Sequence, residues 1–147
     1  MEESRPTVVA VFNTSPDTVD LLRFVFEHAG FTVVSAFTWE MRDSKVDVEA
    51  FMRQHAPHVV VYDIAPPYEE NWHLFQHFSA MPAFRGRKFV ITTTNAKQVH
   101  AVAGDAVTLY EIIGKPYDLD LVVKAVKDAV TGASARSAAT SGSSRPS

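Results

Sequence analysis

The sequence predicts an α/β protein of the (βα)5 type, with a doubly wound five-stranded parallel sheet covered by helices on both faces. Three observations support this prediction: short runs rich in valine and other apolar residues alternate with helical patterns, these runs are predominantly apolar, and polar residues follow them. Continuous apolar runs are typical of strands buried on both faces. Strands that alternate with helices at this pitch form right-handed crossovers in a parallel sheet. We therefore expect one domain over residues 7–130, preceded by a short extension, 1–6.

Each expected strand is a short apolar run bounded by turn-forming residues. The expected strands are residues 7–12, 31–36, 58–63, 88–93 and 107–113. The expected helices are residues 17–29, 46–55, 69–78, 96–103 and 119–130. The first and the last show apolar residues at helical spacing, and Pro57, Pro82 and Gly104 end the three between them. In the first helix, Ser15 or Thr14 can cap the start and Gly30 can close the end. Residues 37–45 show no clear period.

Composition and charge exclude several classes of protein. The chain is 46% hydrophobic and 21% charged, which suits a globular domain with a buried core. Seventeen acidic and fourteen basic residues, with no dense basic stripe, argue against direct binding of nucleic acid or a membrane surface. The chain has no cysteine, which excludes disulfides and thiolate chemistry. Without a signal peptide or an apolar run near the ~18 residues of a membrane span, we expect a cytoplasmic protein.

From residue 131 onward the composition changes to serine, alanine and glycine. Such a segment has too little apolar surface to offset its ordering entropy. We expect residues 131–147 to form a disordered tail.

Polar residues stand where the expected strands end. In a doubly wound sheet, ligands bind beyond the carboxyl ends of the strands. This rule selects Asn13, Thr14, Ser15, Asp63, Thr93, Thr94 and Lys115. A carboxylate such as Asp63 can accept a phosphoryl group as an acyl phosphate. Lys115 can pair with the phosphoryl oxygens, and a hydroxyl, best placed on Thr93, can donate a hydrogen bond to one of them.

From about residue 7 to residue 130, the chain resembles the receiver domains of two-component response regulators, which have the CheY-like, flavodoxin-like fold. PDTVDLLRFVFEHAGFTVVSA (16–36) resembles the first helix and second strand of the family, and HVVVYDIAPP (58–67) its phosphoacceptor strand and loop. FVITTT (89–94) resembles the strand that carries the conserved hydroxyl, and IIGKPYDLDLVVKAV (112–126) the Lys-Pro pair and last helix.

The resemblance implies a stand-alone receiver in two-component phosphorelay signal transduction, in which Asp63 is the phosphoacceptor and Thr93 and Lys115 complete the site. It implies a sensor histidine kinase or another signalling protein as partner, and an output through protein–protein binding. A homodimer is compatible with the family. We expect a signalling protein and not an enzyme.

The expected metal site departs from the family pattern. Family members hold Mg2+ with acidic residues after the first strand, the acceptor aspartate and a backbone carbonyl that corresponds to Ala65. Here residues 13–15 are neutral. Mg2+ prefers hard oxygen ligands and commonly uses one or two carboxylates. We therefore expect Mg2+ to be bound weakly or not at all by the positions Asn13, Thr14, Asp63 and Ala65.

Two further departures concern signalling. Ile112 stands where the family has a switch aromatic, and residues 37–45 form a longer link than is usual before the next helix. Without a competing acidic pair, Lys115 and Asp63 are expected to form an ion pair even without phosphate.

Three functions stay open at this point. The first is the phosphorylated receiver, and the second is a phosphorylation-independent pseudo-receiver that acts as a protein-interaction module. The third is a flavodoxin-type small-molecule binder, because FNTSPDT (12–18) resembles a hydroxyl-rich phosphate loop, although it lacks the glycines of such loops.

Three residues outside the strand ends also have two interpretations. His73 and His77 lie four apart, a spacing that can bind zinc, but no motif supplies a third ligand and a solvated helix face is favoured. Phe24 lies at the polar margin of its expected helix, where it is either an ordinary exposed aromatic or a docking residue.

Overall fold

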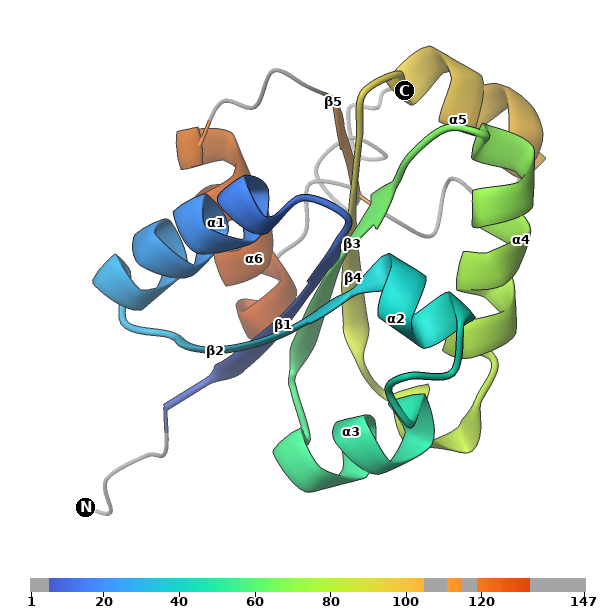
Figure 1. Ribbon diagram of the computed structural model, residues 1–147. Helices are drawn as coiled ribbons and strands as arrows, with labels where there is room; N and C mark the ends of the chain where they lie inside the picture. Colours follow the sequence, from blue (N-terminus) through green and yellow to red (C-terminus); the bar gives the residue numbers. More distant parts are fainter. Residues whose placement is uncertain (1–5, 105–110, 115–118, 133–147) are drawn as a thin grey trace.

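The protein forms a five-stranded parallel sheet with the strand order β2-β1-β3-β4-β5. The computed structural model describes residues 6–104, 111–114 and 119–132. The strands are β1 (Val8–Asn13), β2 (Thr32–Phe37), β3 (Val59–Ile64), β4 (Lys88–Thr93) and β5 (Glu111–Gly114). Every neighbouring pair is parallel. The predicted (βα)5 fold is confirmed (Figure 1).

Helices cover both faces of the sheet. The helices are α1 (Pro16–His28), α2 (Thr38–Arg42), α3 (Val48–His55), α4 (Tyr68–Ser79), α5 (Ala96–Ala103) and α6 (Leu119–Thr131), with a 3-10 turn η1 (Pro82–Phe84) after α4. Helices α1 and α6 pack on one face, and α2 to α5 lie on the other (Figure 1). Among the described residues, no helix combines the length and the apolar character needed to cross a membrane.

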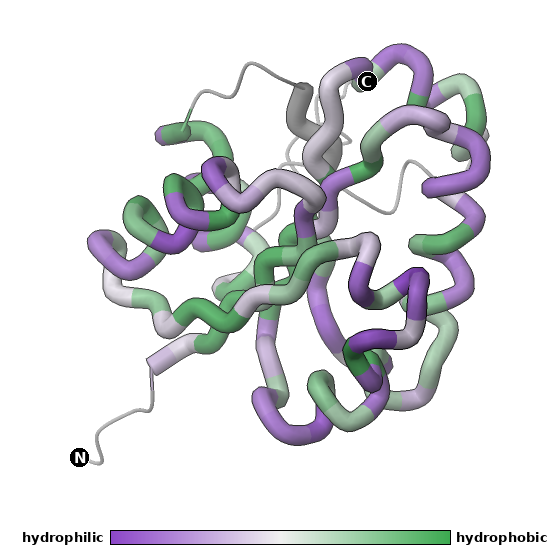
Figure 2. The backbone as a smooth tube through the Cα atoms, viewed as in Figure 1, coloured by the Kyte–Doolittle hydropathy of each residue, from purple (hydrophilic) through white to green (hydrophobic). Residues whose placement is uncertain are grey.

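The core consists of two apolar layers separated by the sheet. Alternate residues of a strand point to opposite faces. In β3, Val59 and Val61 therefore pack toward α1 and α6, whereas Val60 and Tyr62 pack toward α4. All six residues of β3 are buried, as expected for a central parallel strand. Figure 2 shows the hydrophobic strands at the centre and hydrophilic stretches on the outer sides of the helices.

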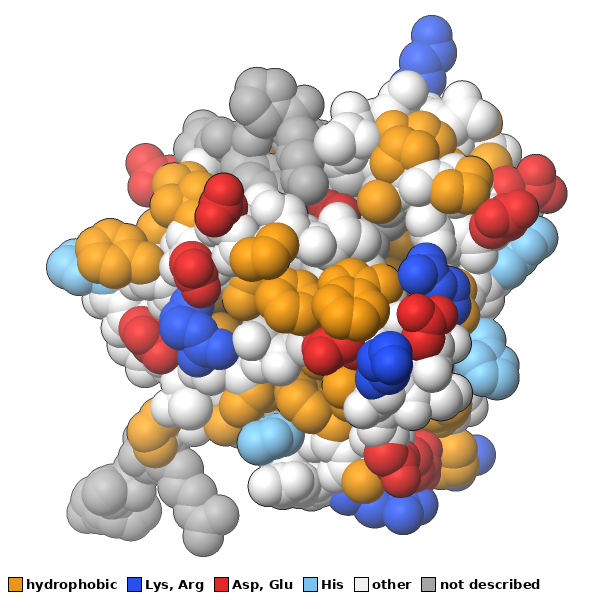
Figure 3. All heavy atoms as spheres, in the orientation of Figure 1, with side chains coloured by type: hydrophobic (Ala, Val, Ile, Leu, Met, Phe, Trp, Pro, Cys, Tyr) orange, Lys and Arg blue, Asp and Glu red, His pale blue; other side chains and the backbone are white. Residues whose placement is uncertain are grey.

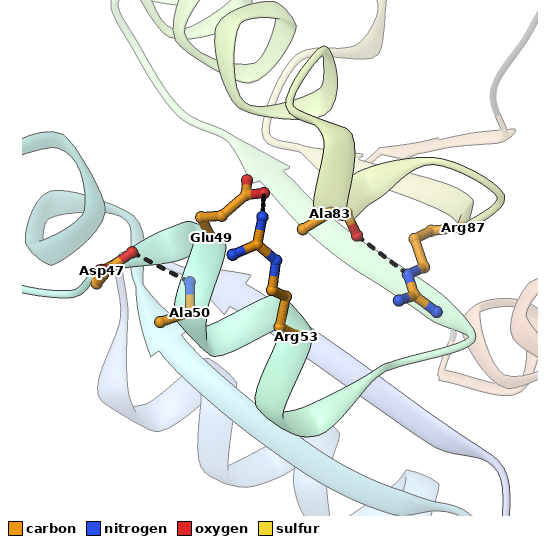
Figure 4. Close-up of polar contacts among 6 residues, drawn as sticks. All are labelled: Asp47, Glu49, Ala50, Arg53, Ala83 and Arg87. Atoms are coloured by element: carbon orange, nitrogen blue, oxygen red, sulfur yellow. Dashed lines mark hydrogen bonds and ion pairs between the residues drawn. The ribbon is translucent and has the colours of Figure 1, made fainter.

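The helix ends follow the chemistry of their sequences. Ser15 caps α1, as expected, because its hydroxyl accepts from the backbone N–H of Thr18 at 3.2 Å. In α3, Asp47 accepts from the N–H of Ala50 at 3.0 Å, and Arg53 pairs with Glu49 at 2.6 Å (Figure 4). The two capping bonds fix where α1 and α3 begin, and the ion pair joins successive turns of α3.

The segment 37–45, for which no period was apparent, contains the short helix α2. It begins after Phe37, whose backbone N–H donates to the Glu40 carboxylate at 3.2 Å. Met41 buries its side chain in the layer on the α4 side of the sheet. The longer link therefore forms a helix that is packed against the core.

Some expectations fall outside the described residues. These are the first part of the strand expected at 107–113, the position of Lys115, and the tail from residue 133 onward. The side chain of Ile112 is also outside them, although its backbone belongs to β5.

Candidate functional site

Asp63 lies near the carboxyl end of the central strand β3 and is 3% exposed. The strand order reverses between β1 and β3, which is where doubly wound sheets bind their ligands. One carboxylate oxygen, Oδ1, accepts a hydrogen bond of 2.7 Å from the Thr92 hydroxyl. This charge-assisted bond between buried groups orients the carboxylate.

The hydroxyl in contact with Asp63 belongs to Thr92, whereas we expected it to come from Thr93. The reason is the strand register, in which Asp63 is paired with Thr92 and Ile64 with Thr93. Paired residues of neighbouring strands project to the same face, so Thr92 shares the face of Asp63. The Thr93 hydroxyl instead donates to the carbonyl of Ile64 at 2.7 Å. It also accepts from the N–H of Asn95 at 3.2 Å.

Two of the positions expected to hold Mg2+ already take part in hydrogen bonds. The side-chain oxygen of the buried Asn13 accepts from the backbone N–H of Ser15 at 3.0 Å. The carbonyl of Ala65 accepts from the side-chain amide of Asn71 at 2.7 Å. Two of the oxygens that would face the metal are therefore already in hydrogen bonds, and Asp63 is the one carboxylate among these positions.

The same hydrogen bonds bear on the phosphate-loop interpretation of residues 12–18. A phosphate loop offers free backbone N–H groups to its ligand. Here the N–H of Ser15 donates to Asn13 and that of Thr18 donates to Ser15. The loop thus uses one of these donors in its own turn and the other to cap α1.

Tyr62 precedes Asp63 in β3 and is 2% exposed. Its hydroxyl is buried and has no hydrogen-bond partner among the described residues. Burial, and secondly the nearby negative charge of Asp63, raise the pKa of Tyr62 above its ordinary value. The phenol therefore remains a neutral hydrogen-bond donor at neutral pH.

A small cavity of about 100 Å3 adjoins Asp63. Its lining includes Thr38, Arg42, Tyr62, Asp63, Ala65 and Asn71. These residues come from α2, from the end of β3 and the loop after it, and from α4. The cavity therefore joins the strand end of the expected site to the helix formed by the longer link. Figure 3 shows charged side chains of both signs beside the apolar surface around α2.

The site predicted from the sequence is thus brought together only in part, because Lys115 lies outside the described residues. The sequence did not single out Thr92, Tyr62, Asn71 or Arg42. A signal existed for Thr92, since three successive threonines end β4 and one of them had to share the face of Asp63. No sequence pattern pointed to Arg42 or Asn71, because their place beside Asp63 depends on where α2 and α4 pack.

The two residues considered for zinc do not form a cluster. Within the described part of the chain, no group of three or more His, Asp or Glu side chains is arranged to hold a metal ion. His73 and His77 lie on α4, consistent with a solvated helix face.

Comparisons with known proteins support the fold. No protein-family model matches the sequence, and no curated protein matches it. Solved structures of response regulators do resemble the chain. The chemotaxis protein CheY4 of Vibrio cholerae is 14% identical with a TM-score of 0.62, over 85% of this chain and 99% of that one.

Two further solved structures resemble the chain to a similar degree. A CheY-like receiver domain from Methylobacillus flagellatus is 16% identical with a TM-score of 0.64, over 85% of this chain and 99% of its own. A response regulator from Thermotoga maritima is 21% identical with a TM-score of 0.62, over 86% of this chain and 99% of its own. The chain therefore has the CheY-like fold of response-regulator receiver domains. At these identities the likeness concerns the fold, and the function has to be argued from the site.

Proposed function

We propose that this protein is a receiver in two-component phosphorelay signal transduction, with Asp63 as the phosphoacceptor and with an output through protein–protein binding. The observation that carries the proposal is the Asp63 carboxylate, which is buried at the end of the central strand of a receiver-type fold and hydrogen-bonded to Thr92. A charged side chain is rarely buried unless its surroundings satisfy it.

The chemistry is the transfer of one phosphoryl group. An oxygen of Asp63 attacks the phosphorus of a phosphodonor and forms a P–O bond. The bond between phosphorus and the leaving group of the donor breaks, and the leaving group takes the electron pair. The product is an acyl phosphate on Asp63. The donor that this proposal implies is a phosphohistidine of a sensor kinase, and we propose that the protein acts in the cytoplasm.

The test is incubation of the full chain with acetyl phosphate, with and without Mg2+, followed by intact-mass measurement. We expect the wild type to gain the mass of one phosphoryl group and Asp63→Asn to gain none. Asp20→Asn removes an exposed carboxylate of α1 and is expected to behave like the wild type. A wild type that gains no phosphoryl mass from any donor condition contradicts the proposal.

A second candidate is a phosphorylation-independent pseudo-receiver that acts as an interaction module. The observation that favours it is the engagement of the Ala65 carbonyl by Asn71 and of the Asn13 amide oxygen by Ser15. The mass experiment separates the two candidates, because a pseudo-receiver gains no phosphoryl mass from acetyl phosphate.

A groove between α1 and α6 offers a surface for a partner in either case. It has a volume of about 460 Å3 and is lined by Phe24, Val25, Leu119, Val123 and Lys127, among others. Phe24 is 69% exposed and stacks on His28 with ring centroids 6.2 Å apart. Exposed aromatic side chains beside an apolar groove are typical of protein contact sites. This is the part of the surface where we place the partner.

A further inference from the structure

A cluster of basic side chains lies at the amino end of β4, opposite to the end of the sheet that carries Asp63. The turn from η1 into β4 places Arg85, Arg87 and Lys88 close together in the chain. Arg85 and Lys88 are exposed, and Arg87 is half-buried. Asp63 lies near the carboxyl end of β3, which runs parallel to β4. This basic turn, residues 85–88, is therefore separate from the candidate phosphoacceptor site.

Backbone hydrogen bonds fix the shape of the basic turn. The N–H of Arg85 donates to the carbonyl of Pro82 at 3.1 Å, and the N–H of Arg87 donates to the carbonyl of Phe84 at 3.2 Å. The side chain of Phe84 is buried in the core, and Lys88 is the first residue of β4. The basic side chains thus project from a backbone that is already ordered, so binding a ligand costs little further conformational entropy.

Within the described part of the chain, the charges of the basic turn are not compensated by an ion pair. Helix α3 packs against η1, but its carboxylate Glu49 is already paired with Arg53 at 2.6 Å (Figure 4). In the sequence, residues 71–104 contain four basic residues and no acidic one. Like charges that lie close together repel one another, and an anionic ligand relieves this repulsion.

The donors of the basic turn suit carboxylates. Arg87 Nε donates to the Ala83 carbonyl at 3.3 Å (Figure 4). This bond orients the guanidinium and leaves its two terminal nitrogens without a partner among the described residues. A guanidinium can donate two parallel hydrogen bonds to one carboxylate. Because the three cations stand on separate residues of an exposed turn, several carboxylates along a peptide match them better than a single anion does.

The charge of the remaining chain limits the size of the ligand. Of the fourteen basic and seventeen acidic residues of the chain, ten basic and all seventeen acidic residues lie outside residues 71–104. A nucleic acid or an anionic membrane extends past the basic turn and meets this negative charge. A short acidic segment interacts mainly with the turn itself, since charges further away than about 8 Å are largely screened at physiological salt.

We infer that the basic turn is a docking surface for a short segment of a partner protein that is rich in Asp and Glu. The inference goes beyond the proposed function and does not rest on it. The turn shares no residue with the cavity beside Asp63 or with the groove between α1 and α6. Binding of the acidic segment is therefore expected to be the same in the wild type and in Asp63→Asn.

The experiment is a titration of a fluorescein-labelled oligoglutamate peptide with the full chain, followed by fluorescence anisotropy. We expect saturable binding that weakens as the salt concentration is raised. The double variant Arg85→Gln with Lys88→Gln is expected to weaken binding by about tenfold, because two exposed cations are lost. Both side chains are exposed, so this variant is expected to keep the melting temperature of the wild type.

Lys45→Gln with Lys97→Gln is the matched control, because it removes the same charge from exposed lysines of the α2–α3 link and of α5. It is expected to retain the peptide affinity of the wild type. On addition of the peptide, amide NMR shifts are expected at residues 84–88. Four results overturn the inference: no peptide binding, equal weakening in the two double variants, shifts confined to the groove between α1 and α6, or equally tight binding of a thymidine oligonucleotide.

Discussion

The Thr92 hydroxyl donates to Asp63 Oδ1 at 2.7 Å, between two buried residues that are paired in the β3–β4 register. Because the contact joins the expected phosphoacceptor to a residue that is fully buried, it restricts the rotation of the carboxylate. Thr92 therefore acts as a positioning residue for Asp63.

Replacing Thr92 by Val keeps the shape of the side chain and removes this hydrogen bond. We expect the free energy of unfolding to fall by about 1–3 kcal/mol, because a partner of a buried carboxylate is lost. We also expect slower phosphorylation of Asp63 by acetyl phosphate, measured by intact mass over time. Chemical denaturation gives the stability of each variant.

Thr93→Val is the control for that experiment. It removes the bond from the Thr93 hydroxyl to the Ile64 carbonyl, and we expect it to cost about 1 kcal/mol. If Thr93→Val slows phosphorylation more than Thr92→Val, the site hydroxyl is that of Thr93, as the sequence resemblance implied.

The second prediction concerns Mg2+. Titration calorimetry of the unphosphorylated wild type is expected to show Mg2+ binding weaker than millimolar, because one carboxylate and already bonded oxygens make a poor site. The double variant Asn13→Asp with Asn71→Ala adds a carboxylate and releases the Ala65 carbonyl. It is expected to bind Mg2+ more tightly than the wild type. Sub-millimolar binding by the wild type contradicts the prediction.

Particular residues show which features of the fold and of the candidate site can be predicted from the sequence. Asp63 could be located because a carboxylate at the end of an apolar run lies at the strand end where such sheets bind ligands. The choice between Thr92 and Thr93 depends on strand register, which a run of three threonines leaves open. Helix α2 has only five residues, too few for a helical period to be visible. The cavity that α2 completes was therefore beyond sequence reasoning.

The third prediction concerns the unpartnered hydroxyl of Tyr62. At neutral pH, Tyr62→Phe is expected to raise the free energy of unfolding by about 1 kcal/mol, because it removes a buried polar group that has no hydrogen bond. Tyr68→Phe is the matched control. The Tyr68 hydroxyl shares a hydrogen bond of 2.6 Å with Thr94, so its removal is expected to lower stability by about 0.5–1 kcal/mol.

The raised pKa of Tyr62 also predicts how stability changes in alkali. An unfolded tyrosine loses its proton near pH 10, whereas the folded protein retains the proton to higher pH. Above that pH the unfolded state binds fewer protons, so stability falls as pH rises, and the contribution is fully present below the unfolded pKa. Denaturation curves between neutral and alkaline pH are expected to show a shallower decline for Tyr62→Phe. Parallel declines in the two proteins contradict the prediction.

The last prediction concerns the exposed edge of the sheet. Strand β2 is an outer strand, and Arg23 of α1 reaches over it. Its guanidinium donates to the Val33 carbonyl at 2.8 Å and to the Ser35 hydroxyl at 2.9 Å. Outer strands with unpaired backbone groups invite pairing with another chain, and charged side chains are a common protection.

Arg23→Ala is expected to lower the free energy of unfolding by about 1–2 kcal/mol, because charge-assisted bonds to the strand are lost. It is also expected to increase self-association, measured by sedimentation velocity. Arg53→Ala removes a surface ion pair of α3 and is expected to change stability by less than about 1 kcal/mol. Arg23→Lys distinguishes charge from geometry, since an ammonium cannot bond both acceptors as a planar fork does. If Arg23→Ala is as stable and as monodisperse as Arg53→Ala, Arg23 does not protect this edge.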